Sequence, residues 1–182
     1  MTLEESRELI HFVRACVESS VKGSDPAISP QLAIMQKCCG AFVTLKKDDI
    51  LRGCIGHIQT TDPLFETIPR ISSQSALSDP RFPPVKIDEL GEITIELSVL
   101  TEPRTVASIR EVQVGRDGII VNGQGRSGCF LPQVGTETGW SAQKFVEQCL
   151  SEKAGLPIDS VSTGEATLEV FEAMIFSETE LT

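Results

Sequence analysis

The sequence predicts an α+β fold in which an antiparallel sheet is covered by helices. Helical patterns of apolar residues occur at 2–21, 62–78 and 141–154, whereas strand-like alternation occupies the middle and the end of the chain. Strand patterns joined by short polar reversals favour antiparallel pairing. The 182 residues are enough for one domain, or for two small lobes that share a core.

The first element is an amphipathic helix at residues 2–21. Thr2 and Glu5 match the capping box, in which each side chain bonds the backbone N–H of the other residue. Apolar residues then recur every three or four positions and predict one buried stripe: Leu9, Ile10, Val13, Cys16, Val17 and Val21. Gly23 ends the helix, and residues 24–30, with two prolines, predict an extended connection.

Residues 41–46 and 50–58 predict a β-hairpin that carries the most unusual run of the chain. In its return strand an arginine, a cysteine and a histidine are separated by glycines: Leu51-Arg52-Gly53-Cys54-Ile55-Gly56-His57. Glycine inside a strand usually marks a bulge or the close approach of another backbone. Two glycines beside the cysteine predict a thiol that a ligand can approach.

The second helix is predicted to start with Asp62 as N-cap and Pro63 at the first helical position. Pro69 lies inside the helical pattern, removes one backbone hydrogen bond and predicts a kink or a break. The helix ends before a loop whose three prolines restrict the backbone around Asp79 and Arg81. These two charged side chains are therefore predicted to have fixed positions.

The second half of the chain predicts a strand at 92–100, a hairpin on a glycine-rich turn, a helix at 141–154 and a long last strand at 165–176. The glycine-rich turn at 123–128 formally matches the G-x-G-x-x-G pattern of dinucleotide-binding folds. In those folds a helix follows the glycines, because its N-terminus binds the pyrophosphate. Strand-like residues follow here, so the pattern favours a hairpin turn and no nucleotide cofactor.

Composition and charge restrict the class of protein. The formal net charge is −10 and basic residues do not cluster, which argues against nonspecific nucleic-acid binding. The chain has no run of 18 apolar residues and an acidic N-terminus, so we expect no membrane span, no signal peptide and a cytoplasmic location. Six cysteines without a Cys-x-x-Cys pair, and only two histidines, predict no metal site.

Seven short runs form a recognisable series along the chain: Phe42-Val43-Thr44-Leu45-Lys46-Lys47, Leu51-Arg52-Gly53-Cys54-Ile55-Gly56, Asp79-Pro80-Arg81-Phe82-Pro83-Pro84, Leu97-Ser98-Val99-Leu100, Gly118-Ile119-Ile120-Val121, Leu131-Pro132-Gln133-Val134 and Lys153-Ala154-Gly155-Leu156-Pro157. In this order the series resembles the AMMECR family over nearly the whole chain. The resemblance implies a single AMMECR-type domain at 1–182, with an α+β core and a larger and a smaller lobe. Because microbial members occur beside, or fused to, Memo-type and radical-SAM proteins, it also implies a partner of that kind.

The hairpin motif and the proline-rich loop supply the candidate ligand-binding residues: Arg52, Gly53, Cys54, Gly56, His57, Asp79 and Arg81. Cys54 is the candidate nucleophile or thiol ligand. Arg52, two positions earlier on the same strand face, is the second candidate catalytic residue, because it could lower the pKa of the thiol and bind an anion. His57 points to the opposite face unless a bulge at Gly56 turns it.

The second helix is expected to return the proline-rich loop to the sheet edge that carries Cys54. Asp79 could then pair with Arg52, which would be a structural ion pair. Alternatively, Arg81 could join Arg52 beside the thiol and form a cationic pocket for a small anion. The two glycines of the motif favour the second arrangement.

Several functions remain open from the sequence. The first is an enzyme or a binding protein that uses Cys54 and Arg52 on a small anionic ligand. The second is a protein-interaction module with a Memo-type or radical-SAM partner, and the third is a redox-responsive thiol protein. A purely structural motif is the further alternative: Cys54 packs under the sheet, Arg52 pairs with a carboxylate and the glycines admit a neighbouring helix.

Overall fold

The computed structural model describes residues 1–25 and 30–181. Of the extended connection predicted at 24–30, residues 26–29 lie outside the described residues. The chain divides into two compact units: a first unit of Met1–Leu100 with Met174–Thr182, and a second unit of Thr101–Ala173. Each unit has a hydrophobic core of its own.

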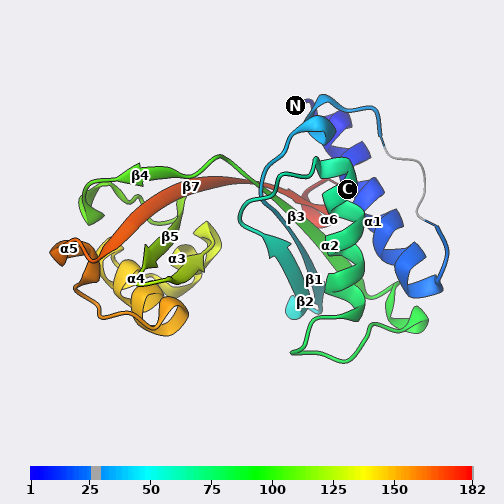
Figure 1. Ribbon diagram of the computed structural model, residues 1–182. Helices are drawn as coiled ribbons and strands as arrows, with labels where there is room; N and C mark the ends of the chain where they lie inside the picture. The colour runs from blue at the N-terminus through cyan, green and yellow to red at the C-terminus, as the bar shows by residue number, and fades with distance from the viewer. Residues whose placement is uncertain (26–29, 182) are drawn as a thin grey trace. The chain divides into compact units, whose positions relative to one another are not determined.

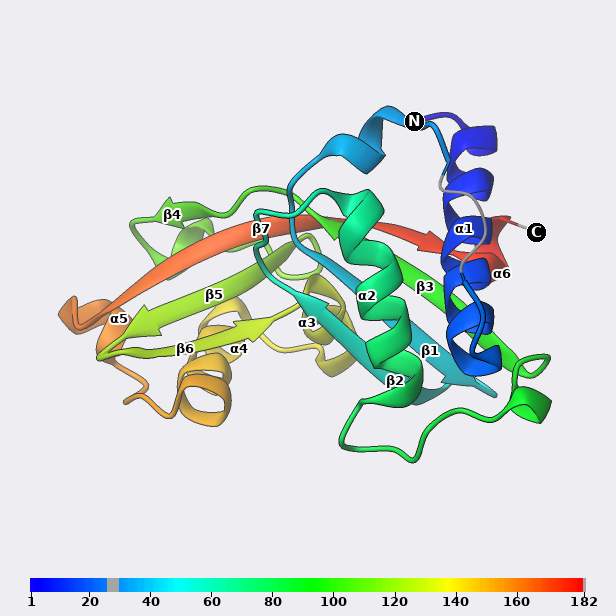
Figure 2. The ribbon, with the colours of Figure 1, turned by 45° about the vertical axis from the view of Figure 1, so that its right-hand side comes forward.

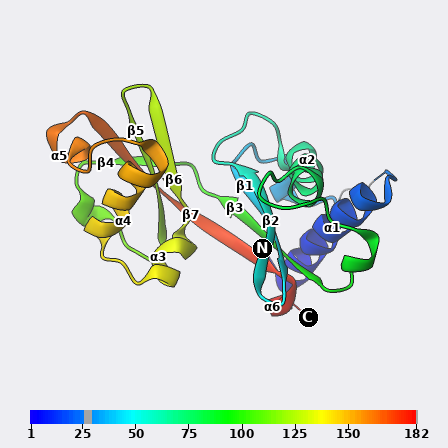
Figure 3. The same cartoon turned by 90° about the horizontal axis from the view of Figure 1, so that it is seen from below.

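The first unit contains an antiparallel sheet with helices on one face. Its elements are α1 (Leu3–Lys22), η1 (Ala33–Gln36), β1 (Ala41–Lys47), β2 (Ile50–His57), α2 (Leu64–Leu77), η2 (Ile87–Glu89), β3 (Ile93–Leu100) and α6 (Glu178–Leu181). β1 lies in the middle and pairs with β2 and β3. Helices α1 and α2 lie on the same side of this sheet (Figures 1 and 3).

Helix α1 forms as its sequence predicts. Thr2 and Glu5 make both bonds of the capping box, and Gly23 ends the helix in the left-handed conformation at φ 69°. The predicted apolar stripe faces the core, because Leu9, Val13 and related residues of the stripe are buried there. The first helix is therefore fixed by signals local to its own sequence.

Helix α2 departs from its prediction in two details. Pro63 is the N-cap with extended backbone (ψ 158°), so the helix starts at Leu64 and the Asp62 carboxylate instead accepts a hydrogen bond from Arg70. The predicted break at Pro69 is wrong, since α2 is one continuous helix. Proline removes a single backbone bond here, and the fully buried residues of α2 hold the helix against the core.

The second unit is also an antiparallel sheet with helices on one face (Figure 2). Its elements are β4 (Arg104–Val106), η3 (Ile109–Glu111), β5 (Asp117–Gly123), β6 (Arg126–Phe130), α3 (Pro132–Thr138), α4 (Ala142–Gln148), the π-helix η4 (Cys149–Ala154), α5 (Ser160–Thr163) and most of β7 (Ala166–Ser177). β5 pairs with β6 and β7, and β4 pairs with β7. Apolar residues of α4 and η4 pack on this sheet.

The glycine-rich turn is the hairpin turn that the sequence predicts, because it joins β5 directly to β6. Gln124 and Gly125 have φ of 51° and 73°, the left-handed values of a tight hairpin turn. The helix predicted at 141–154 is α-helical only to Gln148 and continues as a π-helix. The π-helix packs closely on β6, where a Cβ on Gly128 would lie 2.7 Å from the Ala154 nitrogen.

The architecture confirms the α+β prediction, with antiparallel sheet covered by helices in both units. Short elements such as β4 and α3 could not be predicted from the sequence, because a run of three to seven residues shows too little periodicity. No helix in the described part of the chain combines the length and the apolar character that a membrane crossing requires.

Candidate functional site

The edge strand β2 is held by a carboxylate and a guanidinium from the loop after α2. Asp79 Oδ2 accepts a hydrogen bond from the backbone N–H of Cys54 at 2.9 Å, and Arg81 Nη2 donates to the carbonyl oxygen of Cys54 at 3.0 Å. Asp79 and Arg81 also bond each other, through Nε to Oδ1 at 2.9 Å and Nη2 to Oδ2 at 2.7 Å. We call this arrangement the Asp79–Arg81 clamp.

The two side chains of the clamp differ in their exposure to solvent. The Asp79 side chain is only 2 % exposed, whereas the Arg81 side chain is 53 % exposed and lies over the ring of Phe82 at 5.5 Å. Hydrogen bonds from Arg81 hold the pKa of the Asp79 carboxyl well below its ordinary value, and the N–H of Cys54 adds to this effect against the opposing effect of burial. Asp79 is therefore a fixed anion, and Arg81 presents an oriented guanidinium to solvent.

Arg52 forms a separate set of contacts. Its Nε and Nη2 donate to the two carboxylate oxygens of Glu89 at 3.0 and 3.1 Å, and Nη1 donates to the carbonyl oxygen of Pro83 at 2.9 Å. Only 13 % of the Arg52 side chain is exposed. Arg52 thus fastens the proline-rich loop to β2. The predicted Asp79–Arg52 pair and the predicted Arg52–Arg81 pocket do not form, because Asp79 bonds Arg81 and Arg52 bonds Glu89. The structural alternative, in which Arg52 pairs with a carboxylate, is confirmed for this residue.

The Cys54 thiol is half-buried beside Thr44 of β1. Thr44 Oγ1 donates to Cys54 Sγ at 3.3 Å. Burial raises the pKa of the Cys54 thiol, and this effect outweighs the lowering by Thr44 and by the charge of Arg81. The cation that acts on the thiol is thus Arg81 instead of the predicted Arg52.

The two glycines of the motif allow neighbouring backbone segments to pack closely against β2. A Cβ on Gly53 would lie 2.3 Å from the carbonyl oxygen of Ser75, so the glycine lets the backbone of α2 approach β2. The Ser75 hydroxyl accepts from the N–H of Ile55 at 2.9 Å and donates to the carbonyl oxygen of Val43 at 2.8 Å. A Cβ on Gly56 would meet Ala41 of β1 at 2.2 Å. The space beside both glycines is therefore filled by the protein itself.

His57 lies away from the thiol. It pairs with Ala41 at the end of β2, while Cys54 pairs with Thr44, three positions along the strand. The register between these two pairs has no shift, and the irregularity of this hairpin lies between Leu45 and Lys46. The strand geometry therefore points Cys54 and His57 to opposite faces, and no bulge at Gly56 brings them together.

Comparison with known proteins identifies the family, since the family profile described as AMMECR1 matches residues 10–176. The chain belongs to the AMMECR1 family. A protein of Methanothermobacter thermautotrophicus is 39 % identical and the match covers 98 % of this chain and 96 % of the relative. Protein MK0488 of Methanopyrus kandleri is 40 % identical, with 99 % and 91 % covered.

An AMMECR1-family fold is also seen in a crystal structure titled as that of the uncharacterized protein PH0010 from Pyrococcus horikoshii. It superimposes with a TM-score of 0.85 at 36 % identity and covers 93 % of this chain and 89 % of the other. The names of these relatives state no activity.

The structure brings together only part of the candidate site. Cys54, Asp79 and Arg81 meet in the clamp, whereas Arg52 and His57 lie elsewhere. The sequence analysis missed Thr44, although the hairpin register places it opposite Cys54. It also missed Ser75 and Glu89, for which the sequence carries no signal, because their roles depend on the path of α2 and of the following loop.

Three further thiols of this AMMECR1-family chain are too buried to extend the site. Burial raises the pKa of Cys16, Cys129 and Cys149 to about 12. Such thiols react slowly with oxidants at neutral pH. Within the described residues, His, Cys, Asp and Glu side chains form no group of three that could hold a metal ion.

Proposed function

We propose that this AMMECR1-family protein binds a small anionic ligand, such as a phosphate or a carboxylate, at the surface of Arg81 and Cys54. The orientation of Arg81 carries the proposal. Its guanidinium is fixed by Asp79, by the carbonyl oxygen of Cys54 and by the ring of Phe82, yet its side chain is 53 % exposed. A preorganised, exposed guanidinium binds an oxyanion at a low entropic cost.

Cys54 contributes to this binding surface as a neutral thiol. A nucleophilic thiolate requires a lowered pKa and a base within hydrogen-bond reach. Burial raises the pKa of Cys54 instead, and the motif's histidine, His57, lies on the other face of the strand. The S–H group can donate a weak hydrogen bond to a ligand held by Arg81. A binding role for Cys54 thus has more support than a catalytic role for Cys54 or Arg52.

Arg81→Gln tests the proposal directly. We expect it to weaken binding of phosphate or succinate by about tenfold or more, because charge-assisted bonds to a guanidinium contribute about 1.5–3 kcal/mol. Binding is measured by an NMR titration that follows the amides of Cys54, Arg81 and Phe82 at constant ionic strength. Glutamine can still donate a hydrogen bond to Asp79 but removes the cation paired with this buried carboxylate, so the melting temperature is expected to fall and the amide spectrum is used to show that the fold is kept.

Arg70→Gln is the matched control for this titration. Arg70 is another half-exposed arginine of the first unit, paired with Asp62, and its side chain is 43 % exposed. We expect this variant to bind the two anions like wild type. Equal affinity of wild type and Arg81→Gln, or equal weakening by both variants, would contradict the proposed site.

The second candidate function is docking of a Memo-type or radical-SAM protein. One observation favours it: at the start of the motif strand, Ile50 is 71 % exposed and Leu51 is 38 % exposed. Exposed apolar side chains that lie together can mark a surface for a protein partner. Co-purification with such a partner that is lost in Ile50→Ser and kept in Arg81→Gln would assign the motif region to docking.

We also propose that the two units are the larger and the smaller lobe of one AMMECR-type domain at 1–182. The support is that the family profile extends across both units, and that strand β7 runs from the second unit into the first without interruption.

A further inference from the structure

An aromatic side chain lies near the Cys54 thiol on the sheet of the first unit. Successive residues of a strand point to opposite faces of the sheet. Val43 and Leu45 of β1 belong to the core that α1 and α2 share with the sheet. Phe42 and Thr44 therefore lie on the other face. Phe42 is half-buried and belongs to neither of the two hydrophobic cores in the described part of the chain.

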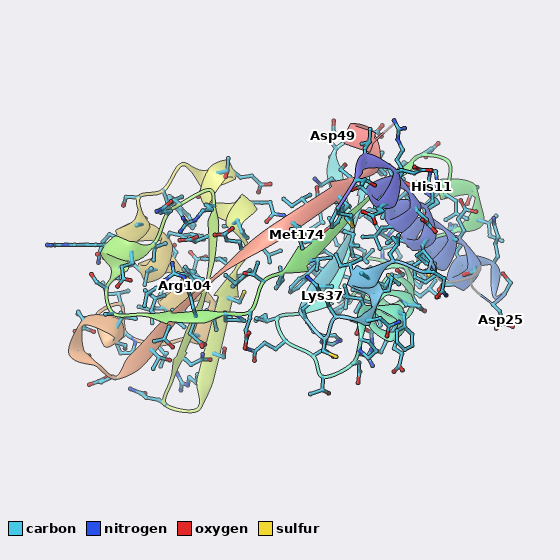
Figure 4. All side chains as sticks on the ribbon, turned by 90° about the horizontal axis from the view of Figure 1, so that it is seen from above. His11, Asp25, Lys37, Asp49, Arg104 and Met174 are labelled. Atoms are coloured by element: carbon cyan, nitrogen blue, oxygen red, sulfur yellow. The ribbon has the colours of Figure 1, made fainter. Side chains whose placement is uncertain are left out.

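The hairpin register places Phe42 close to the thiol. Phe42 of β1 pairs with Gly56 of β2. Thr44 pairs with Cys54, two positions along each strand, so the two pairs are roughly 7 Å apart. The ring of Phe42 lies across Gly56, because a Cβ on this glycine would lie 2.5 Å from the ring atoms Cγ and Cδ1. The hairpin turn, where Figure 4 labels Asp49, is at the opposite end of the β1–β2 pair.

The charges around the thiol favour one direction for the body of a ligand. On the far side of Thr44, the row continues to Glu96 of β3, whose carboxylate pairs with Lys46 at 3.4 Å. Besides burial, the charge of Glu96 raises the pKa of the Cys54 thiol, and the same charge would repel an anion. Arg81 uses Nε and Nη2 for its bonds within the clamp, which leaves Nη1 to bond an oxyanion. The rest of the ligand is then best placed along β2, away from Glu96.

We propose that the ligand of the Arg81 and Cys54 surface is an aromatic oxyanion, an aryl carboxylate or an aryl phosphate, whose ring stacks on Phe42. The inference rests on the proposed function, because Arg81 binds the oxyanion. The separation of roughly 7 Å between the two residue pairs suits a single ring joined directly to its oxyanion. Contacts of the ring with Phe42 and with the Cys54 sulfur add affinity beyond the burial of apolar area. Phe42 is therefore the residue that selects an aromatic ligand.

Two matched pairs of probes test the contribution of the ring: benzoate against acetate, and phenyl phosphate against inorganic phosphate. In NMR titrations at constant ionic strength, we expect the aromatic anion to bind about fivefold or more tightly than its partner. Saturable shifts of the Phe42 and Gly56 amides, and nuclear Overhauser effects between the ring protons of the probe and Phe42, are expected in the wild type. A preference in one pair alone supports the ring contact and identifies the oxyanion.

Phe42→Leu removes the ring and keeps an apolar side chain. We expect it to reduce the preference for the aromatic probe by about threefold or more and to leave acetate binding unchanged. Phe65→Leu is the matched control, because Phe65 is another partly exposed phenylalanine of the first unit, 36 % exposed on α2. This control should keep the wild-type preference. The amide spectrum shows whether each variant is folded, and the wild-type Overhauser effects decide the contact if Phe42→Leu is not.

The possible results separate this inference from the proposed function. If the wild type binds benzoate and acetate equally, and phenyl phosphate and phosphate equally, while Arg81→Gln weakens all four, the role of Phe42 is overturned and the Arg81 site stands. A preference that Phe42→Leu retains, without Overhauser effects to Phe42, would also overturn the inference. The absence of saturable binding for all four probes would overturn both the inference and the proposed function.

Discussion

Gly53→Ala is expected to lower the free energy of unfolding by about 3 kcal/mol or more, because overpacking and strained hydrogen bonds add. The added Cβ would lie 2.3 Å from the carbonyl oxygen of Ser75, so α2 must move away from β2. That movement also strains the bonds of the Ser75 hydroxyl to Val43 and Ile55. Urea unfolding measures the change, since the midpoint falls while the slope stays the same.

Gly91→Ala is the control for this effect. A Cβ on Gly91 meets nothing within 4 Å, and we expect a change within about 0.5 kcal/mol. Total stability of a domain is about 5–15 kcal/mol, so Gly53→Ala would remove a large fraction of it. A Gly53→Ala protein as stable as Gly91→Ala would show that the glycine is not required by the packing of α2.

Asp79→Ala is expected to lower the free energy of unfolding by about 2–4 kcal/mol at neutral pH. The variant loses the buried carboxylate that accepts hydrogen bonds from Cys54 and Arg81, and the N–H of Cys54 loses its partner at the sheet edge. The melting temperature should fall by roughly 4–16 °C. Asp62→Ala removes an aspartate that is 38 % exposed, and its effect should stay within about 0.5 kcal/mol.

The effect of Asp79→Ala has a defined pH dependence. The pKa of Asp79 is lower in the folded protein than its ordinary value. Its contribution is therefore fully present above the unfolded pKa of about 3.9, and it is lost as the pH falls through the lower folded pKa. The difference between wild type and variant should shrink below about pH 4. A difference that is constant from pH 7 to pH 3 would contradict this assignment.

Most of the fold could be predicted from local sequence. The capping box at Thr2 and Glu5 marks the start of α1, and the glycine-rich turn marks the β5–β6 hairpin. The start of α2 was misplaced by one residue, because Pro63 can be an N-cap as well as a first helical residue. Local signals succeed where the bonds that form an element come from residues close in sequence.

The candidate site was predicted less completely, because its contacts join distant residues. The sequence places Cys54 in a strand and Asp79 in a restrained loop, yet it does not tell which arginine pairs with Asp79. The pairing depends on Glu89, which binds Arg52 although the two residues are 37 positions apart in the sequence. The glycines of the motif left two readings open from the sequence, access for a ligand or close approach of a helix, and the packing of Gly53 against α2 shows the second for this glycine.

The central claim is that Cys54 is a neutral thiol beside an oriented, exposed Arg81. The pH dependence of the Cys54 alkylation rate, followed by mass spectrometry with exposed Cys38 as the internal comparison, tests it most directly. We predict an apparent pKa above the ordinary thiol value of about 8.5, and a still higher one in Arg81→Gln, because the charge of Arg81 lowers it. An apparent pKa below the ordinary value, with Cys54 alkylated faster than Cys38 at neutral pH, would contradict the account and favour a nucleophilic thiolate.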